Sequence, residues 1–310
     1  MESVPVFSII IPTYNRAALI SATVNSVLNQ TFKSFEVIIV DDGSTDDTRN
    51  VLQPLLEAHS NISYFKKNNE ERGAARNFGI KHAKGDYVTF LDSDDILYPM
   101  HLQEAINLID KKKLPSVFHL AYEIVRTDGS LVKRFNDHSG SLSLRLVKLG
   151  NLISCMGVFV KREIAEENLF IEDRELSGSE DYELWLRLAG KYEFDYSNTV
   201  TSAIIHHPSR SVLEVSQKNA LIKRVEKVLW HIMNNESFQK KYSKYNNRIF
   251  SVNHCYLSLH LGLMNYRKSA LHYLMLSVKE YPAVVFSKNF LAALKYIFGF
   301  HGIPGRFRSQ

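Results

Sequence analysis

Three carboxylates stand within four residues in the run Asp92-Ser93-Asp94-Asp95, which follows the apolar segment Tyr87–Leu91. Like charges this close repel each other, and a divalent cation that neutralises them makes such a cluster tolerable. Carboxylate oxygens suit Mg²⁺ or Mn²⁺, which in proteins also hold substrate phosphates. The run therefore indicates a cation site, and the alternative is a turn in which Asp95 caps the next helix.

Two further polar motifs come directly after apolar runs. Pro12-Thr13-Tyr14-Asn15-Arg16 follows residues 6–11, and Asp41-Asp42-Gly43-Ser44 follows residues 35–40. An acid in the second motif can accept a hydrogen bond from a nucleobase N–H or a ribose hydroxyl. Asn15 has the alternative role of capping the helix that follows it.

Basic, acidic and small residues combine in two later motifs. Glu71-Arg72-Gly73-Ala74-Ala75-Arg76-Asn77 opens an expected helix, where Arg72 could bind phosphate and the small residues let the backbone approach a ligand. Ser177-Gly178-Ser179-Glu180-Asp181 precedes an apolar helix. Taken alone, this second motif predicts a capping box between Ser177 and Glu180, or a weaker one that starts at Ser179.

These motifs need a scaffold, and the first half of the chain alternates strand and helix patterns. Continuous apolar runs predict buried strands at 6–11, 35–40, 62–65 and 87–91. Helical spacing predicts helices at 19–28, from the turn at 41–46 to about 58 with a distortion at Pro54, at 73–83 and from about 99. The alternation implies a mainly parallel sheet with right-handed crossovers, and ligands bind such sheets at the carboxyl ends of the strands.

The second half of the chain is less regular in its pattern. Residues 115–135 predict a hairpin that turns at Thr127-Asp128-Gly129-Ser130, and helices near 141–150 and 180–189 bracket an irregular stretch. Beyond about Pro208 strand signals fade, and the spacing predicts three or four helices. Residues 281–300 are the most apolar of these, but they contain two lysines, so we expect no membrane-spanning helix.

Charge divides the chain at the same place. Residues 211–310 hold 15 Lys and Arg and 4 Asp and Glu, a net charge of +11, whereas residues 1–210 carry −6. A basic segment suits an anionic partner such as a lipid surface or a phosphorylated acceptor. The alternative is a solvated helical appendage without a partner.

One part of this basic segment could lie on a membrane. Its apolar residues recur at helical spacing, at Phe290, Leu291, Leu294 and Ile297. Such a helix could rest on an anionic membrane surface without spanning it. The alternative is that the same apolar face packs on the first 210 residues or on a second copy of the chain.

Cysteine content and the N-terminus bear on the compartment. Cys155 and Cys255 are the only cysteines and lack metal-type spacing, so we expect no disulfide framework and a reducing compartment. The first residues lack the basic region and cleavage pattern of a signal peptide. We therefore expect a cytoplasmic location, with peripheral attachment to the inner face of the membrane as a further possibility.

The motifs, in this order and spacing, closely resemble the family 2 glycosyltransferases over residues 5 to about 207. The resemblance implies a GT-A fold, which is a Rossmann-like α/β sheet flanked by helices that binds a nucleotide sugar. It implies a catalytic domain at 1–210, with a nucleotide-sugar half at about 1–98 and an acceptor half at about 99–210. Residues 211–310 would form a basic α-helical C-terminal region.

The resemblance also implies roles for single residues on the donor side. Asp41 would meet the uracil or an equivalent base with Asp42 nearby, and Arg72 would touch the base or the diphosphate. In the DXD motif, Asp92 would face the ribose or the metal and Asp94 would ligate Mn²⁺ or Mg²⁺. The remaining residues expected to line the nucleotide pocket are Pro12, Thr13, Tyr14, Asn15 and Ser93.

On the acceptor side, the resemblance makes Asp181 the catalytic base. Glu180 would support the loop or contact the acceptor. His207 aligns with the histidine of an Arg-x-His segment found in many relatives, but Ile205 replaces the arginine. His207 would therefore approach the metal or the diphosphate, and the alternative is a structural loop histidine.

Together these roles imply an inverting, metal-dependent transfer from a nucleotide sugar, with a UDP-sugar expected, to a surface glycan or a lipid-linked acceptor. A sugar-phosphate nucleotidyltransferase would instead need a glycine-rich loop after the first strand, where Pro12-Thr13-Tyr14-Asn15-Arg16 has no glycine. A non-catalytic partner subunit would be expected to lose Asp94 or Asp181, and both are present. No nucleic-acid partner is expected, and a homo-oligomer remains open.

Overall fold

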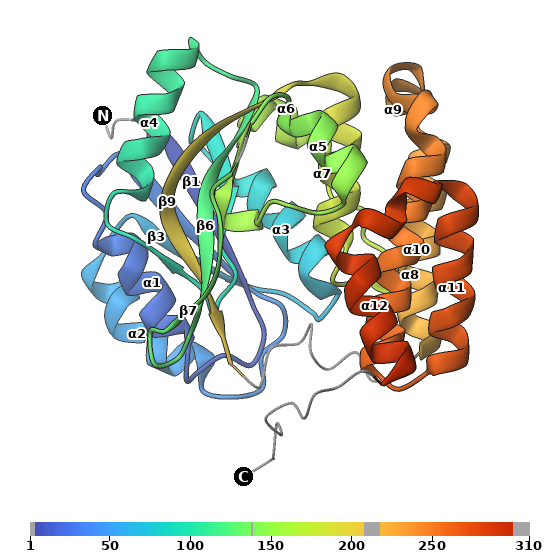
Figure 1. The fold of residues 1–310 in the computed structure, drawn as a ribbon. Coiled ribbons are helices and arrows are strands. Elements are labelled where there is room, and N and C mark those ends of the chain that lie inside the picture. The colour runs from blue at the N-terminus through green and yellow to red at the C-terminus, as the bar shows by residue number, and fades with distance from the viewer. Residues whose placement is uncertain (1–3, 138, 208–217, 300–310) are drawn as a thin grey trace.

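A single sheet lies between layers of helices in the computed structural model, which describes residues 4–137, 139–207 and 218–299 (Figure 1). The sheet order is β3-β2-β1-β4-β8-β6-β9-β5, and β7 pairs with β6 outside this path. This arrangement confirms the expected α/β class. The strands are β1 (Phe7–Thr13), β2 (Phe35–Asp41), β3 (Ile62–Lys66), β4 (Tyr87–Phe90), β5 (Ile96–Leu97), β6 (Val117–Arg126), β7 (Leu131–Phe135), β8 (Val158–Lys161) and β9 (Phe194–His206).

The helices of the first 207 residues follow the predicted pattern closely. Helix α2 continues through Pro54, and α6 falls in the stretch expected to be irregular. These helices are α1 (Ile20–Leu28), α2 (Thr48–Ala58), α3 (Glu71–His82), α4 (His101–Lys112), α5 (Leu142–Leu149), α6 (Arg162–Glu167) and α7 (Glu180–Lys191).

The parallel part of the sheet gathers the polar motifs at one edge. β1 lies between β2 and β4 and runs parallel to both, and β2 runs parallel to β3. In this register Thr13 pairs with Asp41 and Ile10 pairs with Phe90. The motifs that follow β1, β2 and β4 therefore share the carboxyl edge, beside the point where the strand order reverses.

Beyond β4 the sheet is mixed, because β8 runs antiparallel to both β4 and β6 while β6 and β9 are parallel. Neither β8 nor β9 was predicted. β8 is only four residues long, and β9 carries polar residues such as Asn198 and Thr199 through its middle. Register shifts between β6 and β9 also interrupt the alternation that marks a strand in a sequence.

Alternating strand residues build a core on each face of the sheet. Ile9 and Ile11 of β1 join a cluster with residues of α1 and α4, whereas Ile10 joins a cluster with residues of α3 and α7. Because side chains alternate along a strand, one continuous apolar run supplies both cores. This explains why the first strand is apolar at every position from 9 to 11.

Five α-helices make up the described part of the chain from residue 218, one more than the upper number predicted. Figure 1 shows them side by side in orange and red, beyond α3 and α7. Their buried residues belong to the same cluster as Phe90 and Trp185. They are α8 (Lys218–Met233), α9 (Glu236–Tyr242), α10 (Asn246–Leu263), α11 (Arg267–Glu280) and α12 (Lys288–Phe298).

This shared core bears on the predicted domain division. The boundary at 210/211 lies outside the described residues, so the division itself stays a prediction. Ile297 is buried, and Phe290 and Leu294 pack against the common cluster. The apolar face expected to meet a membrane is therefore largely covered by the protein itself. Among the described residues, no helix has the length and apolarity to cross a bilayer.

Candidate active site

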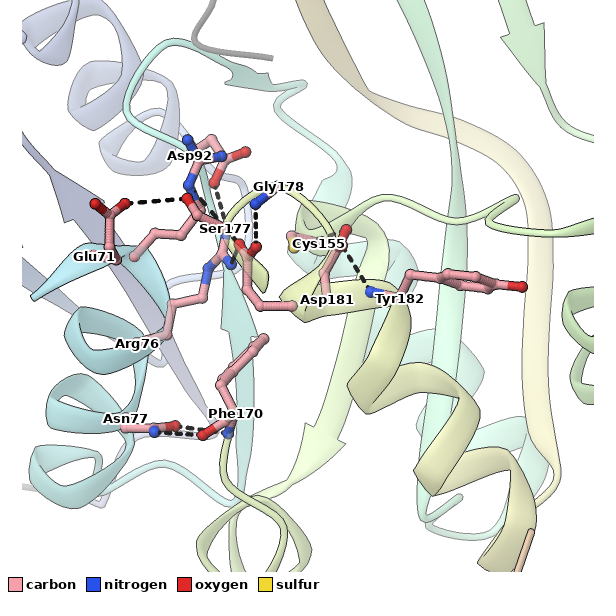
Figure 2. A network of polar contacts seen from close by, with 12 residues as sticks. Glu71, Arg76, Asn77, Asp92, Cys155, Phe170, Ser177, Gly178, Asp181 and Tyr182 are labelled. Carbon is pink, nitrogen blue, oxygen red and sulfur yellow. Dashed lines mark hydrogen bonds and ion pairs between the residues drawn. The ribbon is translucent and has the colours of Figure 1, made fainter. Parts of the chain in front are cut away.

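Arg76 joins two of the predicted motifs at the carboxyl edge of the sheet. From α3, its Nη2 lies 2.8 Å from Asp92 Oδ1, and its Nη1 lies 2.7 Å from Glu180 Oε1 (Figure 2). The side chain is 1% exposed, and its guanidinium also lies over the Phe170 ring. These are strong, charge-assisted contacts in a place shielded from water. The residue therefore holds the acidic run after β4 against the start of α7.

No role was predicted for Arg76, although its motif was identified. A sequence signal existed, because Arg76 follows Arg72 by four residues and so shares its face of α3. The structure confirms this shared direction, since Arg72 Nε lies 3.8 Å from the same Glu180 oxygen. Two arginines on one helical face, in a site expected to hold phosphate, would have pointed to both residues.

Asp181 lines a pocket of about 210 Å³ together with Arg72, Asp92 and Glu180. Its Oδ1 accepts a hydrogen bond of 2.7 Å from the Tyr182 N–H. Burial in the pocket, together with the nearby charge of Glu180, raises the pKa of Asp181 to about 6. A carboxylate with this pKa is ionised at neutral pH and still basic enough to accept a proton from a substrate.

Two groups face the second oxygen of Asp181. Asn151 Nδ2 lies 3.4 Å and Cys155 Sγ lies 3.8 Å from Oδ2. Both residues line the same pocket, and Figure 2 shows Cys155 beside Asp181. Burial raises the pKa of Cys155, so the thiol is the neutral form that can donate to Asp181.

The predicted capping box before α7 is wrong. Ser177 Oγ donates to Glu71 Oε2 at 3.1 Å, and Glu180 Oε2 accepts from the Gly178 N–H at 2.5 Å. Ser179 is the N-cap residue and makes no side-chain capping bond. Ser177 and Glu180 thus bind α3 and the preceding loop and do not cap the helix end, because tertiary partners compete successfully with the local cap.

Asp94 lies beside the end of β9. Its Oδ2 lies 3.2 Å from His207 Nε2 and 3.8 Å from Arg16 Nε. Asp95 Oδ1 accepts a hydrogen bond of 3.0 Å from the Ile205 N–H, so it anchors β9 and does not cap the following helix. Asp95 therefore holds the end of β9 beside the acidic run, where His207 lies next to Asp94.

The residues present fit a divalent cation. Two carboxylates and an imidazole are ligands that Mn²⁺ accepts, and Mg²⁺ accepts the carboxylates. Within residues 4–137, 139–207 and 218–299, no three His, Cys, Asp or Glu side chains are grouped closely enough to enclose an ion. Asp94 and His207 would therefore offer only part of a coordination shell, as is usual where substrate phosphates complete it, and Asp92 is paired with Arg76.

Residues on other loops and strands hold the predicted nucleotide-binding residues Asn15, Asp41 and Asp42 in place. Asn15 Oδ1 accepts from the Thr45 N–H at 2.8 Å, so it binds the loop after β2 and does not cap α1. Asp41 is fully buried, and its carboxylate accepts from the Ser44 N–H at 2.7 Å and from the Tyr64 hydroxyl. Asp42 Oδ1 lies 2.9 Å from Lys67 Nζ.

These contacts join the loops after β1 and β2 into one wall of the site. Pro12, Thr13 and Ser93 are buried there, whereas Tyr14 is exposed. The buried Thr13 hydroxyl has no hydrogen-bond partner among the described residues. Contact of these residues with a nucleotide stays a prediction.

Comparison with known proteins bears on this site. The family model described as glycosyl transferase family 2 matches residues 8–167, about half of the chain. An uncharacterized glycosyltransferase of Rickettsia felis is 35% identical over 189 residues, which cover 59% of this chain and 30% of that protein. The chain thus matches about a third of the length of that relative.

A second relative is the GalNAc(5)-diNAcBac-PP-undecaprenol beta-1,3-glucosyltransferase of Campylobacter jejuni. It is 36% identical over 135 residues, which cover 43% of this chain and 42% of that protein. Among solved structures, S. aureus TarS 1-349 in complex with UDP-GlcNAc aligns with a TM-score of 0.68 at 19% identity, over 95% of this chain and 91% of that one. This likeness confirms the GT-A fold, and the family match shows that the chain belongs to glycosyl transferase family 2.

Proposed function

We propose that this protein transfers a sugar from a nucleoside-diphosphate donor to a hydroxyl group of a glycan or a lipid-linked acceptor. A UDP-sugar is the expected donor, supported by the UDP-GlcNAc bound to the structural neighbour TarS. The lipid-linked acceptor is supported by the PP-undecaprenol named for the Campylobacter relative.

One observation carries this proposal: a single pocket is lined by both Asp92 and Asp181. Asp92 belongs to the motif expected to face the donor, and Asp181 is a carboxylate whose pKa is raised to about 6 by burial and by Glu180. A donor-side acid and a potential general base in one enclosed space are what direct transfer to a hydroxyl group requires.

The proposed reaction proceeds in one displacement. Asp181 takes the proton of the acceptor hydroxyl while the oxygen attacks the anomeric carbon from the face opposite the diphosphate, which inverts the configuration. Arg72, which lines the pocket, faces the departing diphosphate with positive charge. A divalent cation held by Asp94 and His207, with Asp92 nearby, would neutralise the developing charge of the leaving group.

The C-terminal helices are proposed to bind an anionic membrane surface, and of the four apolar residues first expected to meet it only Leu291 is exposed. Phe286 is 87% exposed, Leu291 58% and Phe298 55%. Lys288 and Lys295 are exposed on the same stripe of α12 as Leu291 and Phe298, because positions 288, 291, 295 and 298 recur at helical spacing. We call these four residues of α12, together with Phe286 just before the helix, the α12 stripe.

Charge favours a lipid surface as the partner of the α12 stripe. Between residues 264 and 299 the chain has five basic residues and a single acid, Glu280, which binds His254. Exposed basic and apolar residues that alternate along one helical face match an anionic bilayer interface.

The proposed activity is tested by a donor screen on the purified full chain. Nucleoside-diphosphate sugars are added with Mn²⁺ and an acceptor of the undecaprenyl-diphosphate sugar class, and release of nucleoside diphosphate is measured. Product of inverted anomeric configuration, read by NMR, supports the single displacement. Product of retained configuration excludes it, and donor binding without any transfer favours the alternative of a non-catalytic partner subunit.

A further inference from the structure

Helix α8 contacts the loop that leads into the proposed catalytic base. Arg224 Nη1 donates a hydrogen bond of 3.0 Å to the Ser177 carbonyl. Lys227 pairs with Asp173 and lies 2.6 Å from Glu175, and Lys223 lies 3.3 Å from Glu175. A helix of the C-terminal region therefore binds residues 173–177 through three basic side chains.

Arg224 differs from the two lysines in its surroundings. It is 6% exposed, it forms no ion pair with any carboxylate in the described part of the chain, and its Nε has no hydrogen-bond partner there. Burying a guanidinium against a neutral carbonyl is costly when no carboxylate balances its charge, and none does so within residues 4–137, 139–207 and 218–299.

Gly178 shows how closely the guanidinium approaches the loop. A Cβ at this position would lie 2.5 Å from Arg224 Nη1, and the residue has a φ of +89°. Any side chain here would therefore be strained and would also displace Arg224. The backbone at 177–178 is therefore constrained both by the left-handed conformation of Gly178 and by contact with Arg224.

A short chain of contacts leads from this loop to the reacting groups. The Gly178 N–H donates to Glu180 Oε2, and Glu180 Oε1 binds Arg76, which in turn binds Asp92. Asp181 is the next residue along α7. Figure 2 shows Gly178, Arg76, Asp92 and Asp181 around this one network. A shift of the Ser177–Gly178 backbone would therefore move Glu180 and, with it, the neighbouring base Asp181.

We propose that Arg224 is a positioning residue, through which the C-terminal helices hold the Ser177–Gly178 loop and thereby the base at the start of α7. This inference rests on the proposed transfer reaction with Asp181 as its base. In this proposal α8 is required for the correct placement of Asp181. Arg224 itself acts through the loop and touches no reacting atom.

The experiment compares Arg224→Met with Arg248→Met in the full chain. Arg248 is a matched control, because its Nε donates a hydrogen bond of 3.0 Å to the Lys148 carbonyl across the same boundary, away from the loop. Both substitutions remove one guanidinium–carbonyl bond between the C-terminal helices and the rest of the chain. Only the first frees the residues before Asp181.

We expect Arg224→Met to lower kcat by about 10- to 100-fold while the donor KM changes little, because the base is misplaced but the donor wall is intact. Arg224→Lys should recover part of the loss, since the ammonium can still donate to the Ser177 carbonyl. Arg248→Met should keep kcat near that of the wild type. Equal losses of kcat in the two methionine variants would overturn the proposal.

A readout independent of activity separates this inference from the proposed function. Hydrogen exchange at residues 173–182 should become faster in Arg224→Met and stay unchanged in Arg248→Met. Unchanged exchange in Arg224→Met would overturn the positioning role, whatever the substrate. If instead exchange responds as expected but the wild type transfers no sugar, the proposed function fails and the loop assignment stands.

A second variant covers the case in which Arg224→Met does not fold. Lys223→Met with Lys227→Met removes only solvent-accessible ion pairs to the same loop. It should lower kcat in the same direction by a smaller factor and raise exchange at 173–178. If both measurements match the wild type in this variant, α8 does not hold the loop and the proposal is wrong.

Discussion

At the scale of single residues, the charged side chains of the site differ in whether they form ion pairs. Arg76 forms ion pairs with Asp92 and Glu180, which fixes two motifs relative to each other. Asp181 makes no ion pair in the described structure, and the charge of Glu180 beside it opposes its ionisation. Burial, together with the charge of Glu180, thus raises the pKa of Asp181, as a general base that works near neutral pH requires.

The acid limb of the pH profile should report this base. As pH falls through about 6, kcat should decline tenfold per pH unit because Asp181 becomes protonated. Asp181→Asn should lower kcat by about 10²–10⁴-fold and abolish the limb. Steady-state kinetics from pH 5 to 8 check this, with Asp110→Asn on the exposed face of α4 as the control. A limb that persists in Asp181→Asn would assign the base elsewhere.

The same raised pKa makes a prediction about stability. The folded-state pKa of Asp181 lies above its usual value of 3.8, so the folded protein favours the protonated form and the ionised form destabilises it at neutral pH. Asp181→Asn should raise the free energy of unfolding by roughly 1–3 kcal/mol at pH 7.5. The gain should shrink as pH falls toward 4. Denaturant titrations at both pH values test this, and an Asn variant less stable than the wild type at pH 7.5 would contradict it.

We predict that Asp94 supports nucleotide binding and transfer only when a divalent cation is present. Excess EDTA should abolish transfer, and Mn²⁺ should restore it, because in the proposed reaction Asp94 and His207 would hold a cation that neutralises the leaving diphosphate. Asp94→Asn should weaken Mn²⁺-dependent nucleotide binding, measured by calorimetry with and without the ion. Binding of the nucleotide that is equally tight in EDTA would show that the Asp94–His207 pair serves the fold alone.

At the scale of elements, α3 and β1 set the distance between the arginines and the acids. Gly79 lets α3 approach the sheet, because a Cβ there would lie 2.4 Å from Ile10 Cγ2. The same helix carries Arg72 and Arg76 on the face toward the site. The absence of a side chain at Gly79 thus allows the contacts that Arg72 and Arg76 make with the acids.

Gly79→Ala should therefore affect both stability and function. We expect a loss of about 1–3 kcal/mol in the free energy of unfolding, since overpacking pushes α3 from β1. Weaker donor binding should accompany it, because Arg72 and Arg76 move with the helix. Combining it with Ile10→Ala should cost less than the sum of the two single changes, measured by urea titration. Strictly additive effects would mean that the two residues do not compete for space.

At the scale of the whole molecule, the C-terminal helices both complete the core and carry the most basic surface. Leu221, Ile249 and Ala293 lie in one cluster with Phe90 and Trp185. Removing these helices would expose that cluster, so the membrane question is better asked with surface substitutions than with truncation.

Charge reversal in the α12 stripe tests the membrane proposal. Lys288→Glu with Lys295→Glu should weaken binding to anionic vesicles by on the order of 30-fold or more, since each basic residue near an anionic leaflet adds about 1 kcal/mol. Co-sedimentation at rising salt measures this. The control is Lys240→Glu with Lys244→Glu, which changes the same charge elsewhere in the C-terminal helices. Equal binding by both double variants would refute docking through the α12 stripe.

The sequence alone determined the parallel half of the sheet and the positions of its motifs. Continuous apolar runs, as at 6–11 and 35–40, and helical spacing are local signals, and strand ends locate the polar residues that follow them. The acidic run at 92–95 was therefore placed in advance at the carboxyl edge of the sheet, whereas only the family resemblance placed the Ser177–Asp181 motif at the site. The family resemblance, now confirmed, rested on the same local patterns.

Only the tertiary structure decided which of these residues meet. Arg76 binds Glu180 across 104 residues of sequence, and Arg224 binds Ser177 across 47. Asn15 and Ser177 each follow a local capping pattern, yet bind partners on other elements. β9 and the placement of α8 escaped prediction for the same reason. A local pattern constrains a few neighbouring dihedral angles, whereas these contacts depend on where distant segments pack against each other.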